Sequence, residues 1–245
     1  MLVSNAVIDD LAVEQDHLET ILTGLPEQAW SRASGADGWT VADVVLHLAQ
    51  AEEAVVAAAA GELPDWRGRT DGVDKAMDAL VRAQRTTAAE AFLRWRTARR
   101  GALTALRQAD PQRTLPWVAA SLKPRTLATT RLAEHWAHAL DITGPLGIDY
   151  PDSMRLRHVA WLGHSTLPYA FALTGQQPHD VYCELTAPDN SIWRYGPPGA
   201  DSSITGPAGA FCRVGARRLA PEESGLVTRG PHASAALRLL RNYAG

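Results

Sequence analysis

Apolar side chains recur at helical spacing over most of the first 150 residues. Between Val7 and Leu22 they repeat about every 3.6 residues, and Gly24 and Pro26 then provide a stop. The same period returns in three further segments, which are residues 41–60, 88–106 and 125–142. The pattern therefore predicts four amphipathic helices that pack as a bundle.

Local signals indicate where these helices begin and end. Thr40-Val-Ala-Asp43 and Thr87-Ala-Ala-Glu90 are capping boxes, in which the threonine and the acidic side chain each satisfy a free backbone amide. Pro124 suits the first turn of the fourth helix, which ends at Gly144-Pro145. Gly61 to Gly72 is predicted to be a loop, because Pro and Gly interrupt it, and a helical region follows.

The pattern changes after residue 150. Ser153 to Leu173 predicts a fifth helix, bent near Pro168 because proline removes a backbone donor. Beyond Gly175, short runs typical of strands alternate with two helical pieces, the strands being VYCELTA, SIWRYG, SSITG and GLVTRG. We expect a mainly α protein with a C-terminal α+β unit, divided into a four-helix bundle (1–150), a bridging helix (151–175) and a small α+β domain (176–245).

Composition narrows the class of protein. A formal net charge of −3 and a pI near 6.2 argue against nucleic acid as a partner. The chain starts without a basic segment followed by an apolar one, and no apolar run approaches the roughly 20 residues that span a bilayer. We therefore expect a cytoplasmic protein without membrane contact. Cys183 and Cys212 are too far apart for a Cys-x-x-Cys motif, so no zinc ribbon or disulfide framework is predicted.

The stretch RLAEHWAHALD, residues 131–141, gathers polar groups on one side of the fourth helix. At about 100° per residue, Arg131, Glu134, His138 and Asp141 share one sector, whereas most of the circumference is apolar. We expect this helix to be buried, where a carboxylate and an imidazole must be paired or coordinated. Glu134 and His138 lie one turn apart, which suits an ion pair or chelation of one ion.

His47, in VADVVLHLAQAEE, is the third candidate ligand. Its neighbours Val44 and Leu48 place it towards the core, and no local carboxylate explains it better. Taken alone, a histidine in this position is more often a satisfied core residue than a ligand. His135 lies about 100° round the helix from Glu134 and is not expected to be a ligand.

The two segments GWTVADVVLHLAQAEE and RLAEHWAHALD together resemble the metal-binding signature of the DinB-like four-helix metalloenzymes. The resemblance is to the mycothiol-dependent maleylpyruvate isomerase-type subgroup. The segment RLRHVAWLG and the C-terminal runs are similar to members with a small sterol-carrier-like α/β domain. The resemblance implies a divalent ion, zinc first with nickel or iron as alternatives, held by His47, Glu134 and His138.

The resemblance also implies a function. Three protein ligands leave coordination positions open, as in catalytic sites. In the thiol-dependent branch, the metal lowers the pKa of a thiol such as mycothiol, and the thiolate attacks an electrophilic carbon. The Arg- and Ala-rich composition suits an actinobacterial host, in which mycothiol is available. We expect a metal-dependent isomerase or S-transferase for a small electrophilic substrate, active as a monomer or homodimer. Arg131 is the candidate for steadying an anionic substrate, and Asp141 for orienting a ligand.

Two other functions stay open at this stage. A thiol-independent enzyme of secondary metabolism would use the ion as a Lewis acid for cyclisation, elimination or hydrolysis. A non-catalytic protein would enclose a small apolar ligand and keep a structural ion. A fourth protein ligand, or an ion without an adjacent cavity, would favour the binding protein.

Overall fold

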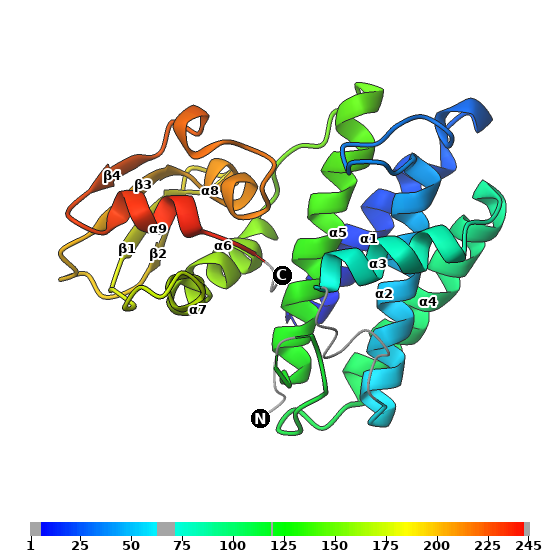
Figure 1. The fold of residues 1–245 in the computed structure, drawn as a ribbon, viewed down its shortest axis with the longest axis horizontal. Helices are drawn as coiled ribbons and strands as arrows, with labels where there is room; N and C mark the ends of the chain where they lie inside the picture. Colours follow the sequence, from blue (N-terminus) through cyan, green and yellow to red (C-terminus); the bar gives the residue numbers. More distant parts are fainter. Residues whose placement is uncertain (1–5, 63–71, 119, 243–245) are drawn as a thin grey trace. The chain divides into compact units, whose positions relative to one another are not determined.

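The computed structural model describes residues 6–62, 72–118 and 120–242. The chain divides into two compact units, of which unit 1 extends to Tyr150 and unit 2 begins at Pro151. The described helices of unit 1 are α1 (Ala6–Thr23), η1 (Glu27–Ala29), α2 (Val41–Ala60), α3 (Val73–Ala83), α4 (Ala88–Gln108) and α5 (Pro124–Leu146). The helices α1, α2, α4 and α5 pack on one another as a bundle, and α3 contacts α2 while running across the bundle's direction (Figure 1).

Both predicted capping boxes are confirmed. In the first, the Thr40 backbone N–H donates to Asp43 Oδ2 at 2.9 Å and the Asp43 N–H donates to Thr40 Oγ1 at 3.2 Å. Thr87 and Glu90 make the same pair of contacts at the start of α4. The helical region after the predicted Gly61–Gly72 loop contains two helices, α3 and α4, while residues 63–71 of that loop lie outside the described residues.

The core of unit 1 lies between the four long helices. Its largest side chain is Trp95 of α4, which is fully buried. Leucines of the other three helices surround this region and are also fully buried, among them Leu11, Leu18, Leu48, Leu127 and Leu132. Burying each such side chain contributes about 1.5–3 kcal/mol. α5 buries residues on most of its circumference, and the polar residues Arg131, His135 and Asp141 are among them.

Unit 2 combines a four-stranded sheet with short helices. Its elements are α6 (Leu156–Ser165), α7 (Leu167–Leu173), β1 (Tyr182–Thr186), β2 (Ile192–Tyr195), β3 (Ser203–Pro207), α8 (Ala208–Gly215), η2 (Pro221–Glu223), β4 (Val227–Arg229) and α9 (Ala233–Leu239). The strand order is β2-β1-β3-β4, in which β1 and β3 are parallel and the other pairs antiparallel. The helix expected to bend near Pro168 is instead interrupted, because α6 ends at Ser165 and Pro168 lies in the first turn of α7.

The sheet of unit 2 has one packed face and one polar face. Cys183 and Leu185 of β1 and Ile204 of β3 are fully buried, and α8 packs against both strands. On the opposite face, Arg194 Nε lies 3.1 Å from Glu184 Oε2. This alternation is typical of a sheet covered on one side only. The expected mainly α fold with a C-terminal α+β unit is confirmed.

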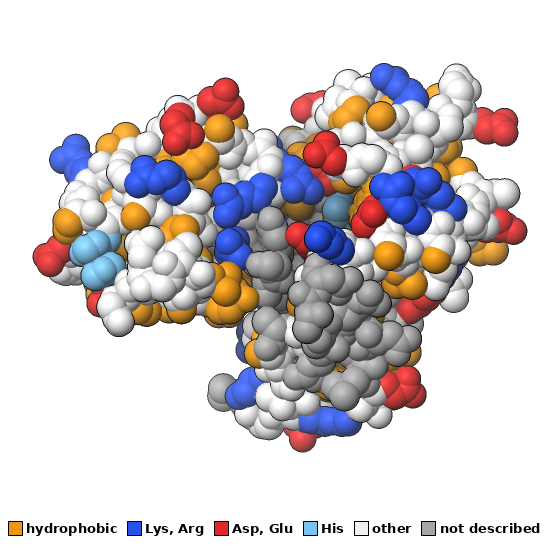
Figure 2. All heavy atoms as spheres, in the orientation of Figure 1, with side chains coloured by type: hydrophobic (Ala, Val, Ile, Leu, Met, Phe, Trp, Pro, Cys, Tyr) orange, Lys and Arg blue, Asp and Glu red, His pale blue; other side chains and the backbone are white. Residues whose placement is uncertain are grey.

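The surface agrees with the modest net charge. Figure 2 shows acidic and basic side chains on the visible face of both units. Within the described part of the chain, no helix is both long and apolar enough to cross a membrane.

Candidate metal centre

Three side chains from α2 and α5 converge inside unit 1. His47 Nε2 lies 2.9 Å from Glu134 Oε1, and His138 Nε2 lies 3.3 Å from the same oxygen. One donor atom from each residue falls within 4.8 Å of the other two. The side chain of Glu134 is 27% exposed, against 8% for His47 and 12% for His138. The group is therefore enclosed on the histidine side and reachable from solvent at the carboxylate.

Asp141 fixes the orientation of His138. Its Oδ2 atom accepts a hydrogen bond from His138 Nδ1 at 2.9 Å, and its side chain is only 2% exposed. A proton held on Nδ1 leaves the lone pair of the neutral ring on Nε2, which faces Glu134. A carboxylate behind a histidine is the usual support of a metal-ligating imidazole.

The surroundings shift the pKa values of Glu134, His138 and His47 in different directions. Burial alone would raise the pKa of Glu134, but hydrogen bonds from His138 and His47 hold it well below its usual value. Burial disfavours the charged form of His138, but its bonds to Asp141 and Glu134 outweigh this and raise its pKa to about 9. Burial lowers the pKa of His47. The arrangement thus stabilises one carboxylate, one neutral imidazole and one imidazole that stays protonated unless a cation replaces the proton.

The donor set fits a divalent ion. Two imidazole nitrogens and one carboxylate oxygen suit zinc, and also ferrous iron or nickel. Within residues 6–62, 72–118 and 120–242, no other set of three His, Cys, Asp or Glu side chains converges in this way. The candidate ligands predicted from sequence are therefore brought together on two helices.

Arg131 is buried in the bundle. Its side chain is 4% exposed, and its Nε donates to Glu52 Oε1 of α2 at 2.9 Å. Its guanidinium also lies over the Trp117 ring at 5.9 Å. Glu52 is not among the residues predicted from the sequence, although the acidic pair Glu52-Glu53 stands out in an otherwise apolar helix. The role of Arg131 towards an anionic substrate stays a prediction.

His135 belongs to the core and is fully buried. Its Nε2 accepts a hydrogen bond from Trp95 Nε1 at 3.1 Å, and its Nδ1 contacts the Arg131 carbonyl oxygen at 2.9 Å. Burial lowers its pKa to about 3, so the ring is neutral. Both ring nitrogens are thus occupied within the bundle.

The fold and this cluster define a class of protein: a helical bundle that presents a candidate divalent-metal centre, followed in the chain by a small α+β unit. Residues 11–143 match the family described as mycothiol maleylpyruvate isomerase N-terminal domain. This match covers more than half of the chain. The protein therefore belongs to that family, as the sequence resemblance implied.

Two further comparisons cover nearly the whole chain. An uncharacterized protein of Mycobacterium tuberculosis, found in strains CDC 1551 / Oshkosh and ATCC 25618 / H37Rv, is 30% identical over 97% of this chain and 95% of its own. The crystal structure of the mycothiol-dependent maleylpyruvate isomerase is similar, with a TM-score of 0.61 at 14% identity over 92% of this chain and 95% of that one. A histidine-to-alanine variant of that enzyme gives a TM-score of 0.60. At this identity the structural likeness supports the fold alone.

The Arg131–Glu52 pair gives a prediction about stability. Arg131→Met should lower the free energy of unfolding by about 3–5 kcal/mol, because it leaves the Glu52 carboxylate buried without its partner. The double variant Arg131→Met/Glu52→Leu should recover most of this loss. Chemical denaturation followed by circular dichroism measures both. Arg107→Met is the control, since the Arg107–Asp9 pair is exposed and should contribute little. Equal losses in the single and double variants would contradict the pairing.

Proposed function

We propose that this protein is a divalent-metal-dependent enzyme that uses a thiol such as mycothiol for isomerisation or S-transfer on a small electrophilic organic substrate. The observation that carries the proposal is the convergence of His47 Nε2, His138 Nε2 and Glu134 Oε1 around a common centre. Zinc is the proposed ion. The match of residues 11–143 to the mycothiol maleylpyruvate isomerase N-terminal family supports the choice of thiol.

Each residue of the centre has a distinct task in this proposal. His47 and His138 offer Nε2 lone pairs, and Glu134 offers a carboxylate that offsets part of the ion's charge. Asp141 keeps the proton of His138 on Nδ1 and thereby directs Nε2 towards the ion. The exposed part of Glu134 leaves access for small molecules from solvent.

The ion would supply a Lewis acid that activates the thiol. A bound divalent ion acts as a Lewis acid and lowers the pKa of a thiol that it binds. A free thiol with a pKa near 8.5 is only a few per cent ionised at neutral pH. Cys183 and Cys212 cannot supply the thiolate themselves, because burial raises the pKa of Cys183 to about 12 and raises that of Cys212 still further.

Removal of a ligand tests the centre. His47→Ala and His138→Ala should each lose bound metal, because two remaining ligands hold a divalent ion weakly. The measurement is metal content by mass spectrometry after dialysis against equimolar zinc, with folding checked by circular dichroism. His135→Gln, three residues from His138 on the same helix, is the matched control and should retain the ion. Unchanged metal content in both alanine variants would refute the assignment.

Thiol dependence gives a separate test. Mycothiol should bind the zinc-loaded protein, and binding should disappear in the metal-free protein and in His138→Ala. Isothermal titration calorimetry measures both states. No binding at millimolar thiol, with the metal centre intact, would favour the thiol-independent Lewis-acid enzyme. An intact centre that binds an apolar ligand and no thiol would favour the binding protein.

A further inference from the structure

The residues before α2 carry a tryptophan against the candidate metal centre. The Trp39 indole is half-buried, and its ring centroid lies 5.0 Å from that of His47 and 6.3 Å from that of His138. The indole thus packs beside both histidines that would hold the ion. Trp39 is not among the residues predicted from the sequence, although it directly precedes the capping residue Thr40.

His47 needs such a neighbour more than His138 does. The ring of His138 is fixed by Asp141. By contrast, the Nδ1 atom of His47 is buried and has no hydrogen-bond partner among the described residues. Metal-ligating histidines usually donate this second nitrogen to a polar group, which sets the plane of the ring. At His47, Glu134 contacts the Nε2 atom, and the Trp39 indole packs against the ring with the two planes inclined by 47°.

The backbone around Trp39 is held firmly. The Ser34 N–H and hydroxyl both donate to the Trp39 carbonyl oxygen at 2.9 Å, and the Trp39 N–H donates to Ala36 O at 3.1 Å. Gly38 completes the turn with φ +75°, a conformation that favours glycine. In addition, the Gly35 N–H donates to the Asp141 carbonyl oxygen at 2.8 Å. This segment is therefore tied to α5 at the residue that orients His138.

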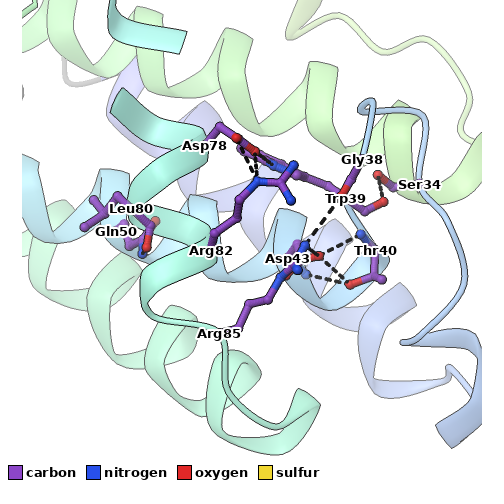
Figure 3. Close-up of polar contacts among 10 residues, drawn as sticks. All are labelled: Ser34, Gly38, Trp39, Thr40, Asp43, Gln50, Asp78, Leu80, Arg82 and Arg85. Atoms are coloured by element: carbon purple, nitrogen blue, oxygen red, sulfur yellow. Dashed lines mark hydrogen bonds and ion pairs between the residues drawn. The ribbon is translucent and has the colours of Figure 1, made fainter. Parts of the chain in front are cut away.

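Helix α3 contacts the indole of Trp39 at its Nε1 atom. Trp39 Nε1 donates to Asp78 Oδ1 at 2.9 Å, and Arg82 Nε contacts both oxygens of the same carboxylate at 3.0 and 2.8 Å (Figure 3). The side chains of Asp78 and Arg82 are 40% and 50% exposed, so this ion pair adds little to stability. Its main consequence is that the plane of the indole is fixed.

We propose that Trp39 is a positioning residue of the metal centre, which restrains the ring of His47, and that Asp78 of α3 acts through Trp39. This inference rests on the proposed function, because it requires that His47 binds an ion. It makes α3, which contributes no ligand, part of the support of the centre.

The experiment measures affinity for zinc and cobalt(II) by competition with a chromophoric chelator. Trp39→Ala should lower the affinity about tenfold, as the loss of a supporting residue around a ligand usually does. Asp78→Ala should lower it about threefold, which corresponds to the net contribution of one hydrogen bond. Asp74→Ala is the matched control on α3, because Asp74 is exposed and makes no contact with Trp39.

A double variant separates action through Trp39 from a general effect on α3. Trp39→Phe keeps an aromatic ring but lacks the indole N–H, so Asp78→Ala should have no further effect in that background. The visible absorption of bound cobalt(II), which reports ligand geometry, should change in Trp39→Ala and Asp78→Ala but not in Asp74→Ala. Trp39→Phe and Asp78→Ala, alone and combined, keep the test decisive if Trp39→Ala does not fold.

The outcomes distinguish this inference from the proposed function. If the wild type binds neither metal, the proposed function fails and the inference fails with it. If the wild type binds metal and His47→Ala does not, but the Trp39 and Asp78 variants keep wild-type affinity and spectrum, the inference alone is overturned. A full effect of Asp78→Ala in the Trp39→Phe background would also overturn it, since Asp78 would then act through the fold of α3.

Discussion

The candidate centre depends on the compensation of one partly buried carboxylate, that of Glu134. Glu134 lies on a helix whose circumference is mostly apolar, where an isolated carboxylate would cost several kcal/mol. His47 and His138 compensate it from two helices, at 2.9 and 3.3 Å from the same oxygen. A divalent ion would meet the same requirement with the same atoms. The contacts that stabilise the carboxylate are therefore also those that prepare a donor set.

A second carboxylate, that of Glu52, is also compensated inside the bundle, but by an arginine and without forming a candidate metal centre. Arg131 Nε and Glu52 Oε1 form an ion pair at 2.9 Å in the bundle interior, and the two nitrogens of the His135 ring contact Trp95 and the Arg131 backbone. The polar stripe of α5 thus separates into two parts. Glu134, His138 and Asp141 face the candidate centre, whereas the other polar groups serve the core. Helical periodicity alone assigns Arg131 to the same sector as Glu134, His138 and Asp141.

The sequence could predict what depends on spacing within a helix. Glu134 and His138 lie one turn apart, and the Thr40–Asp43 capping box fixed the start of α2, so the direction of His47 followed from its apolar neighbours. The contacts of Trp39 and Glu52 could not be predicted, because their partners lie on other helices whose packing is a tertiary property. The interruption of the helix between Ser165 and Leu167 was expected only as a bend near Pro168, because a proline can either bend a helix or end it.

Anomalous X-ray diffraction tests the central claim most directly. Crystals of the zinc-loaded protein would be measured on both sides of the zinc absorption edge. The account predicts one anomalous peak about 2.0–2.2 Å from His47 Nε2, His138 Nε2 and a Glu134 carboxylate oxygen. Crystals that show no anomalous peak there, while the three side chains keep their direct contacts with one another, would contradict the assignment of these residues as metal ligands.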